Sequence, residues 1–142
     1  MAFIYDILLN EMIRVEIATP KGLAFSKDVV SVNIPTVEGE IGVLEKHMYL
    51  MTLLKPGLVY FDGDEKNGIA VSYGVVDVTP EKVLVLSEEA YEVGKIDVGK
   101  AKREFEEAMK RLATAEAMED IKEWEKIKEK SRALIEIAER FG

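Results

Sequence analysis

Residues 13–22 read IRVEIATPKG, and this stretch decides the fold class. Ile13, Val15 and Ile17 alternate with charged side chains, which is the period of two of a half-buried β-strand. Residues 20–22 favour a turn, because proline presets φ and glycine accepts a positive φ. The stretch therefore predicts a β-strand that turns directly into a second strand.

The same period of two continues up to the end of a run that reads VLVLS (residues 83–87). Val30, Val32 and Ile34 alternate with polar residues, so we expect these three side chains to share one buried face. Further strands are predicted on both sides of residues 56–57, in residues 69–78 (IAVSYGVVDV) and after a turn at residues 80–82, with a polar hairpin connection at residues 62–68 (DGDEKNG).

These short strands follow one another with no helical segment between them, which predicts an antiparallel β-sandwich or barrel. Parallel strands are not expected, because they need long crossover connections that usually contain a helix.

The period changes after Glu88, where apolar residues begin to recur at spacings of three and four, as in an amphipathic helix. The first apolar stripe consists of Ala101, Phe105, Ala108, Leu112 and Ala115, and the second of Ile121, Trp124, Ile127, Leu134 and Ala138. Asp97 suits the N-cap of the first helix, since its carboxylate can accept hydrogen bonds from exposed backbone N–H groups. Residues 114–124 contain neither glycine nor proline, so one long helix and a two-helix hairpin both remain open.

Composition limits the classes of function. The chain has 142 residues and a formal net charge of -8, which argues against nucleic-acid binding because phosphates are neutralised by clustered lysine and arginine. Residues 1–94 hold 7 basic and 15 acidic side chains, whereas residues 95–142 hold 12 of each. The absence of cysteine excludes disulfides and thiolate metal sites. We expect three units: a leader (residues 1–12), a β-sandwich (13–90) and a helical unit (91–142).

The leader is apolar, but it contains Asp6 and has no basic residue before Arg14. It is shorter than the ~20 apolar residues of a membrane-spanning helix and lacks the positive start of a signal peptide. We interpret it as an extended leader or an extra edge strand, with Met12 as an alternative start. A surface-lying anchor is less favoured, because such helices use a basic face that is missing here.

Residues 35–47 (PTVEGEIGVLEKH) combine acids, glycines and the only histidine, and could be a catalytic loop, a metal site or a docking edge. With His47 alone, no site with two histidine ligands can form within one chain. A phosphate-binding loop of the GxxxxGK[ST] type is also absent from the sequence. Catalysis by this chain alone is unsupported, and solvated loop charge or protein docking are the remaining interpretations of Glu38 and Glu40.

The joint order of several segments resembles the epsilon subunit of bacterial and chloroplast F-type ATP synthases over about residues 13–140. The segments are IRVEIATPKGLAFS, VNIPTVEGEIGVL, LLKPG, IAVSYG and IDVGKAK. Two positions differ from the usual pattern of that family: Glu45 replaces a proline that commonly stands near the histidine, and Tyr73 replaces a second glycine. The resemblance implies an N-terminal antiparallel β-sandwich followed by a C-terminal α-helical hairpin.

The resemblance also implies a function. The chain would be a noncatalytic central-stalk subunit that couples ion-driven rotation of the c-ring to ATP synthesis and regulates ATP hydrolysis through its C-terminal helices. Implied partners are the gamma subunit, the polar loops of the c-ring and, when the helices are extended, the alpha and beta subunits of the catalytic head. The chain would associate with the cytoplasmic face of the cell (inner) membrane only through this complex. The rival interpretation is a free-standing β-sandwich adaptor with a helical partner-binding tail; a small hydrolase is least favoured.

By resemblance, Glu38, Glu40 and His47 are docking residues at the end of the sandwich that faces the c-ring. The carboxylates of Glu38 and Glu40 would pair with basic side chains of the c-ring. Such pairs would fix the position of the chain on the c-ring more than they raise the affinity. Gly39 and Gly42 would allow close approach of the backbone or a positive φ.

By resemblance again, Lys122, Lys126, Lys128, Lys130 and Arg132 are tail residues that would meet acidic segments of the catalytic head when the helices extend. From the residues alone, the favoured interpretation of any single lysine among them is a solvated helix face with pairs to nearby glutamates.

No cofactor is required on this interpretation, although some members of the family bind ATP as a regulatory ligand at the start of the first helix. The matching residues here are Ile96, Asp97, Lys100, Ala101 and Arg132. Lysine replaces the usual arginine at position 100 and loses the planar fork that engages phosphate through paired hydrogen bonds. We therefore favour a tail that works independently of nucleotide.

Overall fold

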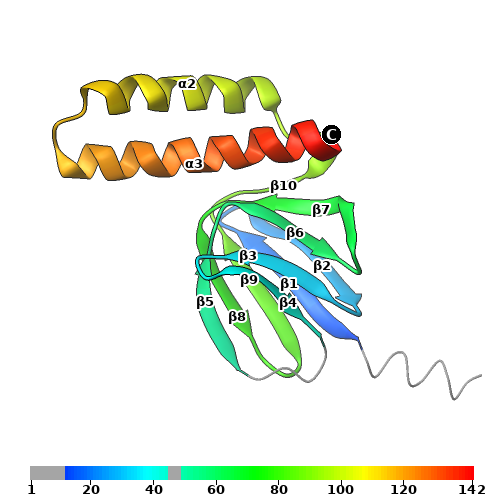
Figure 1. Cartoon of the computed structure of the whole chain (residues 1–142). Helices are drawn as coiled ribbons and strands as arrows, with labels where there is room; N and C mark the ends of the chain where they lie inside the picture. Colours follow the sequence, from blue (N-terminus) through cyan, green and yellow to red (C-terminus); the bar gives the residue numbers. More distant parts are fainter. Residues whose placement is uncertain (1–11, 45–48) are drawn as a thin grey trace, which may run out of the picture.

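The computed structural model describes residues 12–44 and 49–142. In this part of the chain, ten strands precede a short 3-10 helix and two α-helices (Figure 1). The strands are β1 (Ile13–Thr19), β2 (Gly22–Val29), β3 (Val32–Thr36), β4 (Gly39–Val43), β5 (Leu50–Leu54), β6 (Gly57–Phe61), β7 (Asp64–Val71), β8 (Gly74–Val78), β9 (Lys82–Ser87) and β10 (Ala90–Glu92). The leader expected at residues 1–12 lies, apart from Met12, outside the described residues.

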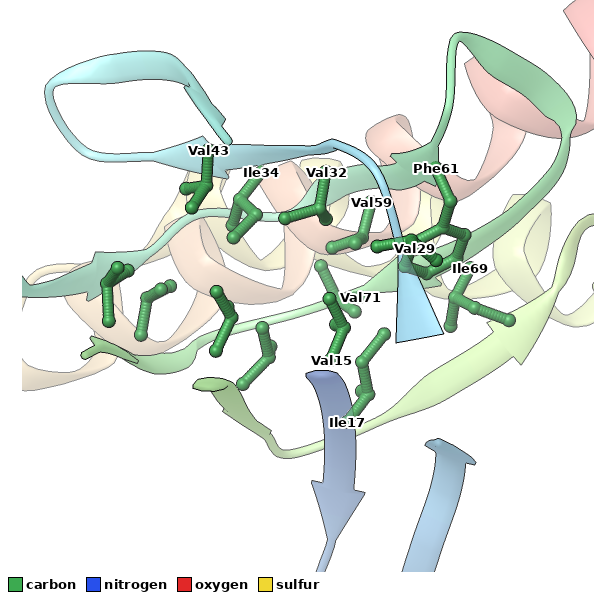
Figure 2. Packing of buried hydrophobic residues seen from close by; sticks show 14 of the residues in the cluster. Val15, Ile17, Val29, Val32, Ile34, Val43, Val59, Phe61, Ile69 and Val71 are labelled. Atoms are coloured by element: carbon green, nitrogen blue, oxygen red, sulfur yellow. The ribbon is translucent and has the colours of Figure 1, made fainter. Parts of the chain in front are cut away.

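The strands form one sheet in the order β10-β7-β6-β3-β5-β8-β9-β1-β2, with β4 paired to β3. The sheet folds over on itself into two layers (Figure 1). Between the layers, Val32, Ile34 and Val59 point toward Val15 and Ile17 (Figure 2), and all five side chains are fully buried. The predicted β-sandwich is confirmed, and the alternation in residues 13–17 is the pattern that builds its core.

One pairing contradicts the expectation of a purely antiparallel sheet. Strand β1 pairs with β2 on one side in antiparallel fashion and with β9 on the other side in parallel fashion, with Arg14 opposite Lys82 and Ala18 opposite Leu86. The crossover that a parallel pair needs is supplied by seven intervening strands in place of a helix. The expectation failed because it considered only local connections.

Val30 is also predicted wrongly. Its side chain is 42% exposed, whereas Val32 and Ile34 are fully buried. The main chain bends between β2 and β3, where the amide groups of Val30 and Ser31 both donate to Asp62 Oδ1 at 2.9 Å. The alternation therefore restarts at Val32, the first residue of β3. Val30 lies between β2 and β3 and belongs to neither strand.

Two connections differ in extent from the prediction. The turn between β6 and β7 contains only Asp62 and Gly63, both with positive φ, and the rest of the DGDEKNG segment belongs to β7. The predicted strand over residues 69–78 is interrupted at Ser72 and Tyr73, where β7 ends and β8 begins.

After η1 (Val93–Lys95), the chain forms α2 (Val98–Thr114) and α3 (Met118–Phe141), so the hairpin is the correct alternative. The side chain of Asp97 accepts a hydrogen bond from Lys100 N at 3.0 Å, as predicted for an N-cap. In Figure 1, α3 lies between α2 and the sandwich. A small apolar cluster joins α3 to the sandwich; its buried members are Ala70, Val93, Ala101, Leu134 and Ile137.

Candidate functional site

The turn between β3 and β4 carries the first predicted docking residue. Thr36 Oγ1 donates to Gly39 O at 2.6 Å and accepts from Glu38 N at 3.2 Å, which fixes the turn. Gly39 has φ of 109°, so the predicted need for glycine is confirmed at this position. Gly42 does not have a positive φ, and a Cβ there would meet only Asn33 Nδ2 at 3.6 Å. Glu38 is exposed on the turn and is available to a partner.

Glu40 has a different environment from Glu38. Its Oε2 accepts hydrogen bonds from Tyr60 Oη at 3.2 Å and from Asn33 Nδ2 at 3.4 Å. Burial, followed by the effect of Glu40, raises the pKa of Tyr60, so its hydroxyl remains a donor. Glu40 also lines a hollow of about 240 Å³ together with Arg140 at the end of α3.

The two predicted acids therefore do not form one cluster, since Glu38 lies on the turn and Glu40 faces the tail. His47, the third predicted docking residue, lies outside the described residues.

An exposed apolar row, which the sequence analysis missed, crosses the outer face of the sheet over β5, β8, β9, β1 and β2. The pairing register places Leu53 opposite Val75, Val75 opposite Leu86, Leu86 opposite Ala18, and Ala18 opposite Leu23. Leu23, Leu53 and Leu86 are 46% to 59% exposed. The available signal was the run VLVLS, in which leucines occupy positions that alternation assigns to solvent. Contiguous exposed apolar surface is typical of interaction sites, so this row is a candidate contact surface.

The five basic tail residues are used unequally. Lys130 Nζ lies 2.8 Å from Glu89 Oε2 and 3.3 Å from Glu104 Oε2, with its side chain 17% exposed. Among the described residues, the ion-pair partners of Arg132 are Glu129 and Glu136, both on α3. The interpretation as a helix face with pairs to nearby glutamates therefore holds for Arg132. It does not hold for Lys130, because Glu89 lies between β9 and β10 and Glu104 lies on α2.

Lys126 is held by an aromatic ring. Tyr73 Oη donates to the main-chain oxygen of Lys126 at 3.2 Å, and Lys126 Nζ lies 5.2 Å from the centre of the Tyr73 ring. Lys122 is exposed and Lys128 half-buried, and none of the ion pairs found among the described residues involves either side chain.

The electrostatics around Glu89 favour its charged form. Burial alone would raise the pKa of this carboxyl, but hydrogen bonds from Lys130 and Tyr91 outweigh burial and hold the pKa below its usual range. Burial lowers the pKa of Lys130, and the contacts with Glu89 and Glu104 overcome this and raise it. Burial and the hydrogen bond to Glu89 raise the pKa of Tyr91 to about 12.

The start of α2 partly assembles the predicted nucleotide residues. Ile96, Asp97, Lys100 and Ala101 line one hollow of about 160 Å³, whose wall also contains Glu89 and Glu104. Arg132 is not among the lining residues. The structure thus brings together four of the five, with two further carboxylates beside them.

Within residues 12–44 and 49–142, no group of three or more histidine, cysteine or acidic side chains is arranged to hold a metal ion. No helix in the same residues has the length and apolar character needed to cross a membrane.

Comparison with known proteins identifies the class. The family model "ATP synthase, Delta/Epsilon chain, beta-sandwich domain" matches residues 12–93. An ATP synthase epsilon chain of Aquifex aeolicus is 70% identical over 106 residues, which cover 74% of this chain and 80% of that protein. An ATP synthase epsilon chain of a Hydrogenobaculum species is 52% identical over 131 residues, covering 92% of this chain and 96% of that protein.

A solved structure agrees with these relatives. A chain in the mitochondrial ATP synthase of Euglena gracilis (OSCP/F1/c-ring) superposes with a TM-score of 0.71 and 26% identity, covering 87% of this chain and 79% of that one. The sandwich places this protein in the delta/epsilon class of ATP synthase chains. The chain belongs to the family of ATP synthase epsilon chains.

Proposed function

We propose that this chain is a noncatalytic rotor subunit in the central stalk of an F-type ATP synthase. There it couples ion-driven rotation of the c-ring to ATP synthesis and regulates ATP hydrolysis through α2 and α3. The observation that carries the proposal is the 52% identity to an epsilon chain over 92% of this chain, because the match includes both the sandwich and the tail.

Two surfaces are proposed as contacts within the complex. The exposed apolar row over Leu23, Leu53 and Leu86 suits a stable contact with the gamma subunit, since burying it would remove large apolar side chains from water. Glu38, with Glu40 and His47, is proposed to contact the polar loops of the c-ring. Membrane association then follows from the complex, at the cytoplasmic face of the cell membrane.

Co-purification tests the proposal. The chain is produced together with the gamma subunit of the same synthase, and the two are expected to elute as one complex. Leu86→Glu is expected to weaken the complex by placing a charge in the apolar row, whereas Lys66→Glu, at an exposed position on β7 outside the row, is expected to leave it intact. Elution of the unmodified chain only as a monomer would favour the free-standing adaptor instead.

The regulatory role needs a separate test. Removal of residues 97–142 leaves a sandwich with its own buried core, so it is expected to fold and to bind the stalk. Hydrolysis by the reconstituted complex is expected to rise, because the proposed contacts of Lys122, Lys126, Lys128, Lys130 and Arg132 with the alpha and beta subunits are lost. Unchanged hydrolysis would contradict the regulatory role while leaving the stalk assignment in place.

A further inference from the structure

A second row of outward-facing side chains runs beside the exposed apolar row on the outer face of the sheet. In this row Met51 lies opposite Asp77, Asp77 lies opposite Leu84, and Leu84 lies opposite Glu16. The two valines that flank Asp77 in β8 are fully buried, so the alternation of the strand turns Asp77 outward. The second row therefore places a carboxylate directly next to the apolar row.

Asp77 has apolar neighbours on three sides of this face. Met51 and Leu84 are its direct cross-strand neighbours, and Val75 of the apolar row lies two positions away on β8. Leu86 pairs with Val75 and is thus a diagonal neighbour, within reach of a long side chain. Met51 is 70% exposed, whereas Asp77 is half-buried between its neighbours. A partner that covers these apolar side chains therefore covers Asp77 as well.

Other charged side chains of the same face are paired within the chain. Glu16 Oε1 forms an ion pair with Lys82 Nζ, and Arg14 Nη1 lies 3.4 Å from Asp28 Oδ1. The ion pairs and side-chain hydrogen bonds formed among residues 12–44 and 49–142 do not include the carboxylate of Asp77. Asp77 thus has the charge on this face that is available to a partner.

Covering Asp77 has a large cost unless the partner supplies a cation. A carboxylate that enters an interface without a partner loses its hydration and gains nothing in exchange. The helical hairpin lies at the end of the sandwich near β7 and β10, so it leaves the outer face of β5 and β8 open (Figure 1). A basic side chain of a partner could reach Asp77 between Met51 and Leu84. Arginine suits this position best, because its planar guanidinium can bind both carboxylate oxygens.

We propose that Asp77 determines the specificity of the contact with the gamma subunit, by binding an arginine or lysine that gamma presents within an apolar patch. This inference rests on the proposed function, since the partner it names is gamma. The apolar row supplies the area of the contact. Asp77 rejects apolar surfaces that lack a cation at this position, because they leave its carboxylate buried and unpaired.

Surface plasmon resonance measures the affinity of the full-length chain for an immobilised subcomplex of the alpha, beta and gamma subunits of the same synthase. Asp77→Asn keeps the shape of the side chain and removes its charge. We expect this variant to raise the dissociation constant about thirtyfold or more, mainly through faster dissociation, because the cation of gamma stays buried without its partner.

The matched control is Asp28→Asn, the same substitution at another outward-facing carboxylate of this sheet. Its side chain is 59% exposed and already pairs with Arg14. We expect the dissociation constant of the control to change less than about threefold, because exposed ion pairs contribute little. Circular dichroism of each variant shows whether the sandwich remains folded.

Asp77→Leu separates a basic partner from an apolar one. Leucine at this position extends the apolar row, so an apolar surface on gamma would bind this variant more tightly than the unmodified chain. With a cation on gamma, Asp77→Leu is expected to weaken binding at least as much as Asp77→Asn. Tighter binding by Asp77→Leu would overturn the proposal.

Substitution of each basic residue of gamma in turn by glutamine identifies the partner of Asp77. The expected partner is the residue whose loss weakens binding of the unmodified chain but has little further effect on Asp77→Asn. Additive effects at every basic residue of gamma would contradict the ion pair.

The same measurements distinguish this inference from the proposed function. If the unmodified chain does not bind the subcomplex, the proposed function is wrong, and this inference with it. If Leu86→Glu weakens binding while Asp77→Asn and Asp77→Leu bind like the unmodified chain, the contact with gamma is retained and the role of Asp77 alone is wrong.

Discussion

Gly74 lies directly against the main chain of Leu86 on the neighbouring strand. A Cβ atom at position 74 would lie 1.7 Å from Leu86 O, a distance that no packing adjustment of side chains can relieve. Gly74 starts β8 at the point where the chain leaves Tyr73, which binds α3. This close approach of two backbones belongs to the β8–β9 pairing and lies next to Tyr73, whose hydroxyl donates to the main-chain oxygen of Lys126 on α3.

Gly74→Ala is expected to lower the free energy of unfolding by about 3 kcal/mol or more, because the strands must move apart to admit the methyl group. Urea unfolding followed by circular dichroism measures the change. The control is Gly94→Ala in η1, where a Cβ would meet nothing within 4 Å, and a change below ~0.5 kcal/mol is expected. Equal effects of the two substitutions would contradict this account of Gly74.

Val32→Asp is expected to cost ~3 kcal/mol or more, because it places an unpaired carboxylate in the sandwich core. The matched substitution Val30→Asp, two residues away at a 42% exposed side chain, is expected to cost less than ~1 kcal/mol. Urea denaturation of both variants measures the difference. A loss under ~1 kcal/mol for Val32→Asp would mean that the register of β3 is misassigned.

Tyr91 makes stability sensitive to alkaline pH. Its pKa is about 12 in the folded chain against an ordinary value of 10.0, so the unfolded chain loses the phenolic proton first. The folded chain then binds more protons than the unfolded chain, and the free energy of unfolding falls as pH rises from about 10 to about 12. Its contribution is complete below pH 10.0.

The difference in unfolding free energy between the unmodified chain and Tyr91→Phe isolates this effect, since all other titrating groups are shared. Across this pH interval, we expect the free energy of unfolding of the unmodified chain to fall more than that of Tyr91→Phe. Parallel curves for the two proteins would show that Tyr91 titrates alike in the folded and unfolded states.

ATP is expected to bind weakly, with a dissociation constant above ~10 μM, equivalent to a binding free energy weaker than about -7 kcal/mol. Glu89 and Glu104 line the hollow that contains Asp97 and Lys100, and carboxylates beside a triphosphate oppose binding. Calorimetric titration of the isolated chain with ATP measures the constant. Tighter binding that is lost in Lys100→Ala would overturn the expectation and support a regulatory nucleotide site.

The periodicity of apolar residues and the turn-forming residues predicted most of the strands and both helices. The alternation in residues 13–17, the turn at residues 20–22 and the two apolar stripes of the tail all follow from periodicity, and each has the predicted place in the structure. Val30 was misplaced because its bend is held by Asp62, a residue 32 positions away.

The candidate site was less accessible to sequence reasoning for the same reason. The hydrogen bond from Tyr60 to Glu40 joins residues that are 20 positions apart, and the ion pair between Lys130 and Glu89 joins residues that are 41 positions apart. No local sequence pattern around one of these residues indicates its partner. Tyr73 stood out as a departure from the family pattern, but its contact with α3 required the packing of the two units to be known.

The parallel pairing of β1 with β9 has a consequence for the order of folding. β1 is synthesised before β9, and the residues of β9 that pair with it, 82–86, follow almost seventy positions later. Contacts of such long range carry a high entropic cost of loop closure and slow the folding reaction. The helical hairpin, whose contacts are local, forms rapidly once it is synthesised. Its docking surface includes Ala70 of β7 and Val93 of η1, so the tail can dock only after these elements of the sandwich are in place.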